Sequence, residues 1–323
     1  MAQPTNTFDT YDAKGIREDL QDKIYQVSPE STPCLSSIRR FKANNTLHEW
    51  QRDNLAAPDK DNAVIEGDDR TGTALTATER VGNYTQLFDK VVVVTTDADT
   101  VTKAGRGKEV KYQTAKAIKE LKRDMEASIL SINPAVAGNS TTARKSGGLG
   151  VFLYTNVNHG GAGATPAHTS GAPTTVNTAG TNRTFTEALT KTVMQLAATN
   201  SSDIPSLMSL TPSHKGTFSG FTGIAANRYQ VAKGKQGTII GGADVYMSDF
   251  GEIMVVPNYV QATANANTAY ILNPEYAGFA YRQEFKTEDL AKTGHSTKKL
   301  VSAEGCLVVT NEKAHAKVAN LTA

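Results

Sequence analysis

The chain has 323 residues, of which 39% are hydrophobic, 20% charged and 7% aromatic. This length suits two ordinary domains or one domain with large excursions, and the composition suits β structure and long loops. The formal net charge of +2 excludes the chain-wide basic footprint of a dedicated DNA-binding protein. No apolar run approaches the ~18 residues of a membrane span, and residues 1–9 do not form a signal peptide. We therefore expect the chain to be made and folded in the cytosol.

Residues 1–45 form a polar leading segment. Its one amphipathic stretch, residues 16–25, places Ile16, Leu20 and Ile24 on one helical face. A turn-rich break follows at residues 28–33. A polar leader of this kind is typical of a segment that is either disordered or packed along a partner.

The β arm predicted at residues 46–96 has almost nothing of its own to bury. Its first limb (46–52) carries charge on both faces, its return limb (83–90) runs on into four valines, and the tip between them is rich in acids. An isolated two-stranded hairpin is marginal in water, so we expect a neighbouring copy of the chain to support the arm. The residues expected at contacts between copies are Trp50, Arg52, Asp68, Asp69, Arg70, Tyr84 and Phe88.

Apolar residues at steps of three and four predict a long helix at residues 108–132. At ~1.5 Å per residue this helix extends about 35 Å, and Pro134 stops it. Its opposite side carries six cations interleaved with three acids. A surface facing solvent or another subunit is favoured there over one that contacts phosphate backbones. The apolar stripe consists of Val110, Ile118, Leu121, Met125 and Ile129.

The second half of the chain mixes one helix with short strands. Residues 155–183 form a long glycine-rich loop of the kind that is functional, disordered or displayed on the surface. A second helix is expected to begin at Thr184, because Thr184 and Glu187 have the spacing of a capping box. The class is therefore α+β, and a doubly wound parallel sheet is disfavoured. Strands are predicted at residues 207–210, 244–247, 253–256, 269–272, 278–282 and 299–310, with a helical turn within 213–227.

Three hints of ligand chemistry have simpler explanations. His159 and His168 lie in the glycine-rich loop without further ligands at metal-binding spacing, so solvated histidines are favoured. The run Gly-Arg-Gly-Lys at residues 105–108 lacks the spacing of a phosphate-binding loop and predicts a tight turn into the helix. Cys34 and Cys306 are far apart in sequence and are expected to be buried reduced thiols.

No catalytic constellation is visible in the sequence. Asp97 with Asp99, and Asp68 with Asp69, are closely spaced acids of the kind that is usually solvated. Neither a nucleophile elbow nor a His-Glu-x-x-His motif is present. We therefore predict that the chain is not an enzyme and has no metal site and no cofactor.

Taken in order, these elements resemble the major capsid proteins of tailed double-stranded DNA bacteriophages, whose fold is shared with encapsulins and herpesvirus capsid proteins. The similarity covers nearly the whole chain and lies in short motifs in collinear order. Asn-Thr-Phe-Asp-Thr-Tyr opens the chain at residues 6–11, and Glu-Gly-Cys-Leu-Val-Val-Thr-Asn-Glu lies near its end at 304–312. The other similar motifs are residues 15–20, 31–33, 120–126, 142–149, 248–251, 255–258 and 290–294.

The resemblance implies a division of the chain. The fold would be an α+β phage major capsid fold with an N-terminal arm, an extended β-hairpin loop, a peripheral domain with a long spine helix, and an axial domain. The extended loop would reach over an adjacent subunit, and the axial domain would gather around five-fold and six-fold positions. The expected parts are the arm (1–45), the extended loop (46–96), the peripheral domain with its spine helix and glycine-rich insertion (97–183), the axial domain (184–272) and a C-terminal return completing the peripheral domain (273–323).

The resemblance also implies a function and partners. The chain would be a structural subunit that self-assembles as pentamers and hexamers into an icosahedral shell. The shell would enclose double-stranded DNA without sequence-specific binding, and would form in the host cytoplasm before becoming part of the virion. A separate scaffolding protein, a portal and decoration proteins would be partners, and no membrane would be involved.

Two alternatives stay open from the sequence. An encapsulin-like compartment would hold protein cargo in place of a genome. A hydrolase or nuclease with a degenerate motif would depend on acids such as Asp97 or Asp249.

Overall fold

The computed structural model describes the whole chain except residues 1–27, 29, 70, 73, 222–243 and 323. The amphipathic stretch expected at residues 16–25 and the candidate contact Arg70 therefore lie outside the described residues. In the part that is described, no helix is long and apolar enough to cross a membrane.

The strands and helices are interleaved along the chain, and the predicted α+β class is confirmed. The strands are β1 (Arg39–Lys42), β2 (Leu47–Arg52), β3 (Glu79–Tyr84), β4 (Gln86–Thr95), β5 (Val157–Asn158), β6 (Leu207–Leu210), β7 (Val245–Ser248), β8 (Gly251–Pro257), β9 (Ala269–Leu272), β10 (Ala277–Leu290), β11 (Ser296–Val309) and β12 (Ala316–Val318). The helices are α1 (Pro33–Ser37), α2 (Thr96–Thr100), α3 (Glu109–Leu130), α4 (Leu149–Phe152), α5 (Glu187–Asn200), α6 (Pro212–Ser219), α8 (Gln261–Ala264) and the 3₁₀ turn η1 (Glu312–Ala314).

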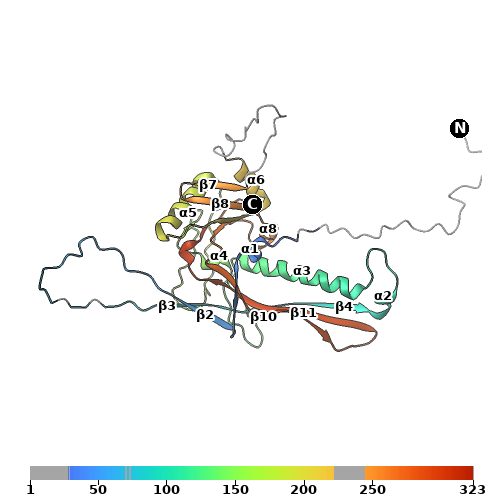
Figure 1. The fold of residues 1–323 in the computed structure, drawn as a ribbon. Coiled ribbons are helices and arrows are strands. Elements are labelled where there is room, and N and C mark those ends of the chain that lie inside the picture. The colour runs from blue at the N-terminus through green and yellow to red at the C-terminus, as the bar shows by residue number, and fades with distance from the viewer. Residues whose placement is uncertain (1–27, 29, 70, 73, 222–243, 323) are drawn as a thin grey trace, which may run out of the picture.

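The long helix α3 lies along a four-stranded sheet with the order β1-β10-β11-β4 (Figure 1). The predicted helix is confirmed to within two residues at each end. Leu121, Met125 and Ile129 of its apolar stripe are buried against the sheet, where they join Phe279 and Leu307 in one core. Because residues three and four apart share a helix face, this stripe needs only one sheet to cover it.

A six-stranded sheet with the order β5-β12-β9-β6-β8-β7 forms the second unit. Every residue of β6 and β9 is buried, and α5 and α6 cover the core of this sheet. All six predicted strands are present, although β10 extends well beyond its predicted end. The last strand, β12, pairs with β5 and β9. Residues 273–323 therefore contribute to both sheets, since β10 and β11 lie in the four-stranded sheet and β12 in the six-stranded one.

The predicted start of the second helix is wrong. Helix α5 begins at Glu187, and its N-cap Thr186 makes no side-chain capping bond. The reason lies in Arg183, the residue before Thr184, because Arg183 forms a parallel β-bridge with Leu321. Its N–H donates to the carbonyl of Asn320, and its carbonyl accepts from the N–H of Thr322. This pairing keeps the backbone extended at the position where the capping box required a helix to begin.

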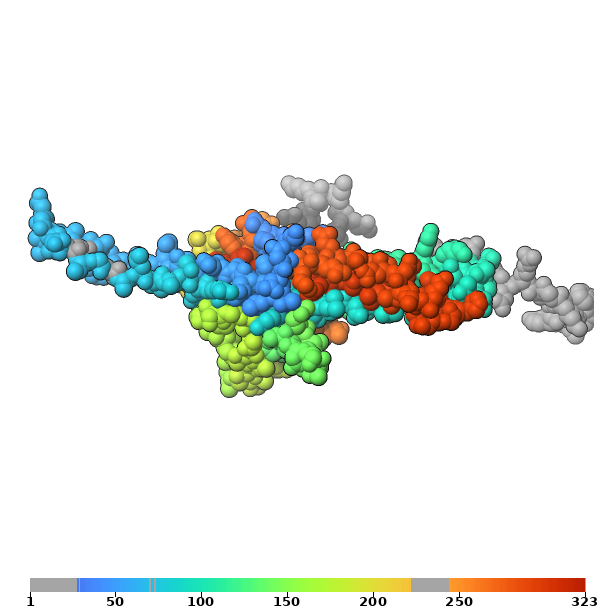
Figure 2. Space-filling model, turned by 90° about the horizontal axis from the view of Figure 1, so that it is seen from below, coloured from blue at the N-terminus to red at the C-terminus, as the bar shows by residue number. Residues whose placement is uncertain are grey.

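The arm projects from one end of the molecule (Figures 1 and 2). Strands β2 and β3 pair in antiparallel register from Leu47 opposite Tyr84 to Arg52 opposite Glu79. Between them, the described residues of 53–78 form neither strand nor helix, and all are exposed. The valine run after β3 was expected to continue the arm. It lies instead in β4, which pairs with β11 over residues 86–95. In the view from below, residues near 140 and the glycine-rich insertion form a lobe that protrudes from one side of the body (Figure 2).

Candidate assembly surfaces

The base of the arm is held by the chain's own core. Trp50 packs on Phe152 with ring centroids 6.1 Å apart, and its Nε1–H donates to the carbonyl of Val309 at 3.0 Å. Phe88 is only 6% exposed and lies in the core shared by α3 and the four-stranded sheet. The expectation that the arm buries almost nothing of its own is therefore wrong for these two residues, because tertiary packing within the chain already covers them.

Arg52 fixes the direction in which the arm leaves the body. Its Nε pairs with Glu79 at 2.6 Å, across the last register position of the hairpin. Its Nη2 donates to the hydroxyl of Tyr154 at 2.9 Å and to the carbonyl of His168 at 2.9 Å. This predicted contact residue thus joins both limbs of the arm to the body of the same chain.

The tip of the arm has no such support. Leu55 is 99% exposed and Leu75 is 98% exposed, while Asp68 and Asp69 lie fully in solvent. Residues 53–78 contain six acids and two basic residues. Of the predicted contact residues, Asp68 and Asp69 are free for a partner, Tyr84 is half-buried at the foot of the hairpin, and Arg70 is outside the described residues.

Strand β4 is a surface that the sequence reasoning missed. It is an edge strand of the four-stranded sheet, and its burial alternates along its length. Phe88, Val92 and Val94 face α3, whereas the apolar side chains of Leu87, Val91 and Val93 lie on the outer face and are more than half exposed. A long edge strand with an apolar outer face is a site for pairing with another chain. The alternation from residue 86 onward was the signal available in the sequence.

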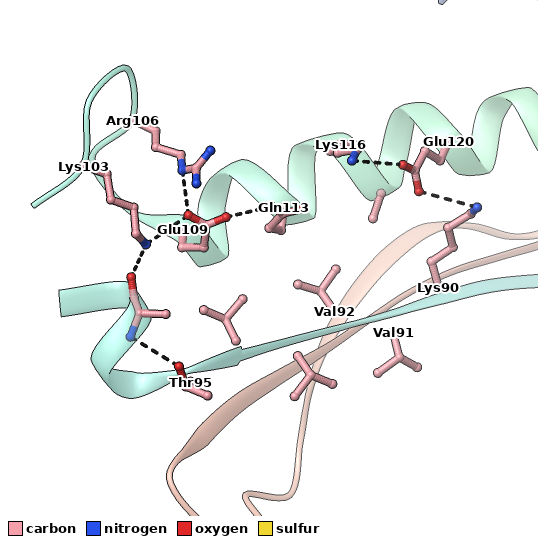
Figure 3. A pocket seen from close by; sticks show the side chains of 14 residues that line it. Lys90, Val91, Val92, Thr95, Lys103, Arg106, Glu109, Gln113, Lys116 and Glu120 are labelled. Carbon is pink, nitrogen blue, oxygen red and sulfur yellow. Dashed lines mark hydrogen bonds and ion pairs between the residues drawn. The ribbon is translucent and has the colours of Figure 1, made fainter. Parts of the chain in front are cut away.

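A groove of about 670 Å³ runs between β4 and the first half of α3 (Figure 3). Its floor is formed by the valines of β4, and its rim is ionic. Lys90 of β4 bridges to Glu120 and Asp124 of α3 at 3.6 and 3.0 Å. Lys116 pairs with Glu120 at 3.8 Å along the helix. The two Lys90 pairs hold the strand and the helix together, so the groove is a structural seam.

The run at residues 105–108 is the predicted tight turn. Gly105 has φ +73°, a conformation that glycine adopts without strain. The helix that follows is capped from outside, since the carboxylate of Asp99 accepts from the N–H of Val110 at 3.1 Å. Hydrogen bonds from Gln113 and Lys103, with the charge of Arg106, lower the pKa of Glu109 to about 2. The cations near the turn are therefore already engaged with acids of the same chain.

The end of the body opposite the arm is basic. Residues 96–123 contain eight basic residues against four acids, and residues 282–299 contain five against three. Lys108 is exposed just before α3, Lys111 and Lys116 are exposed on α3, and Lys286 and Lys292 are exposed at the far end of β10 and just beyond it. In Figure 1, α2 and the turn between β10 and β11 lie at the opposite end of the molecule from the arm. The molecule therefore has an acidic end and a basic end.

The outer edge of the six-stranded sheet is also apolar. β7 is an edge strand, and Val245 and Met247 on it are exposed. Phe250 in the following turn and Met254 on β8 add to the same exposed group. This edge is a second candidate surface for a copy of the chain.

The structure shows where the residues behind the ligand hints lie. His168 lies edge-on to Phe152 and Tyr154, and burial, with the charge of Arg52, lowers its pKa to about 4. Both cysteines are buried and free, as predicted. Among the described residues, no group of three or more His, Cys, Asp or Glu is placed to hold a metal ion. Asp97 is exposed on α2 and Asp249 is exposed in the turn after β7.

The chain thus combines a helix-backed sheet and an outstretched arm with a second sheet, and this fold is shared with solved phage capsid structures. Solved structures agree over nearly the full chain. The cyanophage A-1(L) capsid matches with a TM-score of 0.64 at 14% identity, covering 98% of this chain and 99% of that one. A Gordonia phage Cozz structure matches at 0.63 and 8%, covering 99% and 97%. These likenesses show the fold.

The family model described as SU10 major capsid protein matches residues 3–322, so the chain belongs to the SU10 major capsid protein family. The major capsid protein of Escherichia phage Phieco32 is 36% identical over 179 residues, which is half the length of this chain and half of that relative. The family and this relative are thus both described as major capsid proteins, and the chain spans about half the length of the relative. An encapsulin from Synechococcus elongatus is a more distant structural relative, with a TM-score of 0.52 at 12% identity.

Proposed function

We propose that the acidic arm of each copy lies over the basic end of an adjacent copy, and that this contact builds the shell. The observation that carries the proposal is the tip of the arm. Its described residues within 53–78 are exposed and include bare leucines, although the base of the same arm is firmly packed. An arm with a rigid root and an unburied tip is suited to contact a surface beyond its own chain.

Charge favours a head-to-tail arrangement. The acidic tip and the basic end lie at opposite ends of one molecule, so they can meet only between molecules (Figure 1). Such a contact is heterologous, because different surfaces of the two copies meet. A heterologous contact generates closed rings when its rotation closes. Opposite charges at the two ends also steer copies into this register and away from tail-to-tail pairs.

The edge strands provide surfaces for the same assembly. The outer face of β4 at Leu87, Val91 and Val93 lies toward the basic end, where the neighbour's arm would arrive. Backbone pairing along such an edge gives affinity, and the apolar side chains give register. The exposed edge at β7 would face other copies around the axes of pentamers and hexamers, which corresponds to the axial role expected for residues 184–272.

The remaining partners follow from the class of protein. A separate scaffolding protein would guide assembly in the host cytoplasm, a portal would occupy one vertex, and decoration proteins would bind outside. The enclosed double-stranded DNA would be held without sequence-specific contacts, in keeping with a net charge of only +2. The chain would have no enzymatic activity of its own.

The test replaces the arm tip without shortening it. A variant in which residues 55–76 become a Gly/Ser sequence of equal length keeps the reach of the arm but removes its charges and its leucines. Electron microscopy of the expressed wild-type chain should show closed shells, whereas the variant should stay as folded small species with unchanged far-UV circular dichroism. Shells of normal size from this variant would overturn the proposed role of the arm.

A further inference from the structure

The exposed side of α3 carries a ridge of lysines. Because residues three and four apart are neighbours on a helix surface, positions 108, 111, 115, 119 and 122 follow one another along it. All five residues are exposed. At ~1.5 Å per residue, the distance from the first to the last is about 20 Å. We call these residues the α3 ridge; they are Lys108, Lys111, Ala115, Lys119 and Lys122.

The acids of α3 do not lie on this ridge. In the sequence they are interleaved with the lysines, and that pattern weighs against a contact with phosphate backbones. In the structure, Glu109 and Glu120 line the groove toward β4 and pair there with cations of the groove (Figure 3). Asp124 bridges to Lys90 on the same flank at 3.0 Å. Glu126 is fully buried, and its carboxylate accepts from the backbone of α1, so the fold separates the acids from the ridge.

Two acids from neighbouring segments reach the ridge. Glu30 pairs with Lys119 at 2.9 Å, and Asp99 lies 3.7 Å from Lys108. Both lysine side chains remain more than half exposed, so these are surface pairs of little strength. Among the described residues, no carboxylate lies within ion-pair distance of the other two lysines of the ridge. Four lysines against two acids leave the ridge positive.

A positive ridge of this length fits the backbone of double-stranded DNA. The phosphates of each strand follow one another at ~3.4 Å along the duplex axis, so about six of them span the ridge. The ridge has no arginine, asparagine or glutamine, which are the side chains that most often read base edges. Lysine ammonium groups bind phosphates as point charges, so the contact would not depend on sequence.

We propose that the α3 ridge contacts the phosphodiester backbone of the double-stranded DNA enclosed by the shell. This inference rests on the proposed enclosure of DNA and names the surface of the chain that meets it. It also orients the subunit, because α3 would lie on the inner side of the shell. The outer face of β4, where a neighbour's arm would arrive, lies on the other face of the four-stranded sheet from α3. Assembly and DNA contact would therefore use opposite faces of one sheet.

Fluorescence anisotropy of a short labelled duplex, titrated with the unassembled full-length chain at several salt concentrations, tests the proposal. Lys119→Gln with Lys122→Gln removes the two ridge lysines furthest from the basic end, where a neighbour's arm would rest. Each lost phosphate contact lowers the slope of log affinity against log salt by ~0.9, so this double variant should lose about 2 from the slope and bind about ten-fold more weakly at low salt. Duplexes of different sequence should bind alike.

Lys145→Gln with Lys191→Gln is the matched control, because it removes two exposed lysines that lie outside α3. This control should bind the duplex as the wild type does. The inference is overturned if the wild type does not bind the duplex, if the ridge variant binds as tightly as the wild type, or if the control loses as much affinity as the ridge variant.

A second readout needs no variant. Chemical acetylation followed by mass spectrometry should show Lys119 and Lys122 protected when the duplex is added, with Lys191 unprotected. Protection by an acidic peptide with the sequence of residues 53–78, but not by the duplex, would assign the ridge to the arm of another copy and overturn the inference.

Electron microscopy separates this inference from the proposed assembly. The Lys119→Gln/Lys122→Gln variant should form shells of normal size, because the arm contact does not use these lysines. Normal wild-type shells, together with unchanged DNA binding by this variant, would remove the ridge contact and leave the proposed assembly standing. A wild-type chain that binds DNA through the ridge but forms no shells would remove the assembly proposal and leave the ridge contact in place.

Discussion

The side-chain amide of Asn258 donates to the carboxylate of Glu126 at 2.6 Å. This one contact connects the last two turns of the long helix to the segment between β8 and α8. The same carboxylate accepts the backbone N–H groups of Cys34 at 2.9 Å and Leu35 at 2.7 Å. Glu126 is fully buried, and burial raises its pKa. A single acid therefore holds α1, α3 and the second sheet in one arrangement.

Replacing Glu126 by alanine should destabilise the chain by about 3–5 kcal/mol. Two buried donors and one partly buried donor would lose their acceptor, and each unsatisfied buried group costs about 1–3 kcal/mol. Denaturant unfolding of the unassembled chain measures the loss. Glu120→Ala removes an acid from the same helix whose surface pairs are worth about 1 kcal/mol at most, so it is the matched control. Equal stability of the two variants would show that the Glu126 contacts contribute little.

The buried acid Glu304 should make stability depend on pH. Burial raises its pKa, but the hydrogen bond from Thr85 and the pairs with Arg282 at 2.6 Å and Arg144 at 2.9 Å outweigh this and leave the pKa below the usual 4.5. Its contribution is therefore present above pH 4.5 and lost as pH falls through the lower folded value. Glu304→Gln should cost about 3–5 kcal/mol near pH 7 and less below pH 4.

Urea unfolding of wild type and Glu304→Gln from pH 3 to pH 7 checks this profile. Glu284→Gln, on the exposed side of β10, should follow the wild type at every pH. A difference between wild type and Glu304→Gln that stays constant across this range would contradict the assigned pKa direction.

Reversing the charge of the arm tip should block assembly, and opposite charge changes at the basic end should restore it. Asp68→Lys with Asp69→Lys would bring like charges together if the tip lies over the basic end of a neighbour. The unassembled chain should keep its stability within about 0.5 kcal/mol, because both side chains lie in solvent. Light scattering should show slow or absent shell formation.

Combining these changes with Lys111→Asp and Lys292→Asp, two exposed lysines at the basic end, should recover part of the assembly rate. The rescue separates a charge contact between copies from a general effect of charge on solubility. Failure of the combined variant, together with normal assembly of Asp68→Lys/Asp69→Lys alone, would remove the electrostatic part of the proposed contact.

The outer face of β4 should matter for assembly but not for folding. Val91→Lys and Val93→Lys place charges on a face that is more than half exposed, so unfolding free energies should change by about 1 kcal/mol or less. Sedimentation should show loss of shells, because a charge on an edge strand opposes pairing. Val101→Lys, also exposed but outside β4, should assemble normally. Shells from both β4 variants would exclude this face as an interface.

The sequence predicted elements well wherever a local period decides the structure. The stripe of α3 and the short buried strands β6 and β9 lie within two residues of their predicted bounds. The start of α5 was wrong because a long-range bridge between Arg183 and Leu321 overrides a local capping pattern. No local signal shows which distant strand will pair with a given segment.

The candidate contact residues fall into two groups, those covered by distant parts of the same chain and those left exposed at the arm tip. Trp50 and Phe88 were predicted to contact other copies, but within the chain Phe88 is buried and Trp50 is partly buried, with a hydrogen bond to Val309, 259 residues away. The tip at residues 53–78 needed no such partner, so the exposure of its described residues followed from composition alone. The buried acids Glu126 and Glu304, and the lysine at 317, could not be recognised as buried until the fold placed them.

The position of the arm in an assembled particle tests the central claim most directly. A cryo-electron microscopy map of particles formed by the full-length chain should show a closed shell in which residues 53–78 of each copy rest on the far end of the four-stranded sheet of an adjacent copy. Particles in which this segment folds back on its own chain, or a protein that stays monomeric at high concentration, would contradict it.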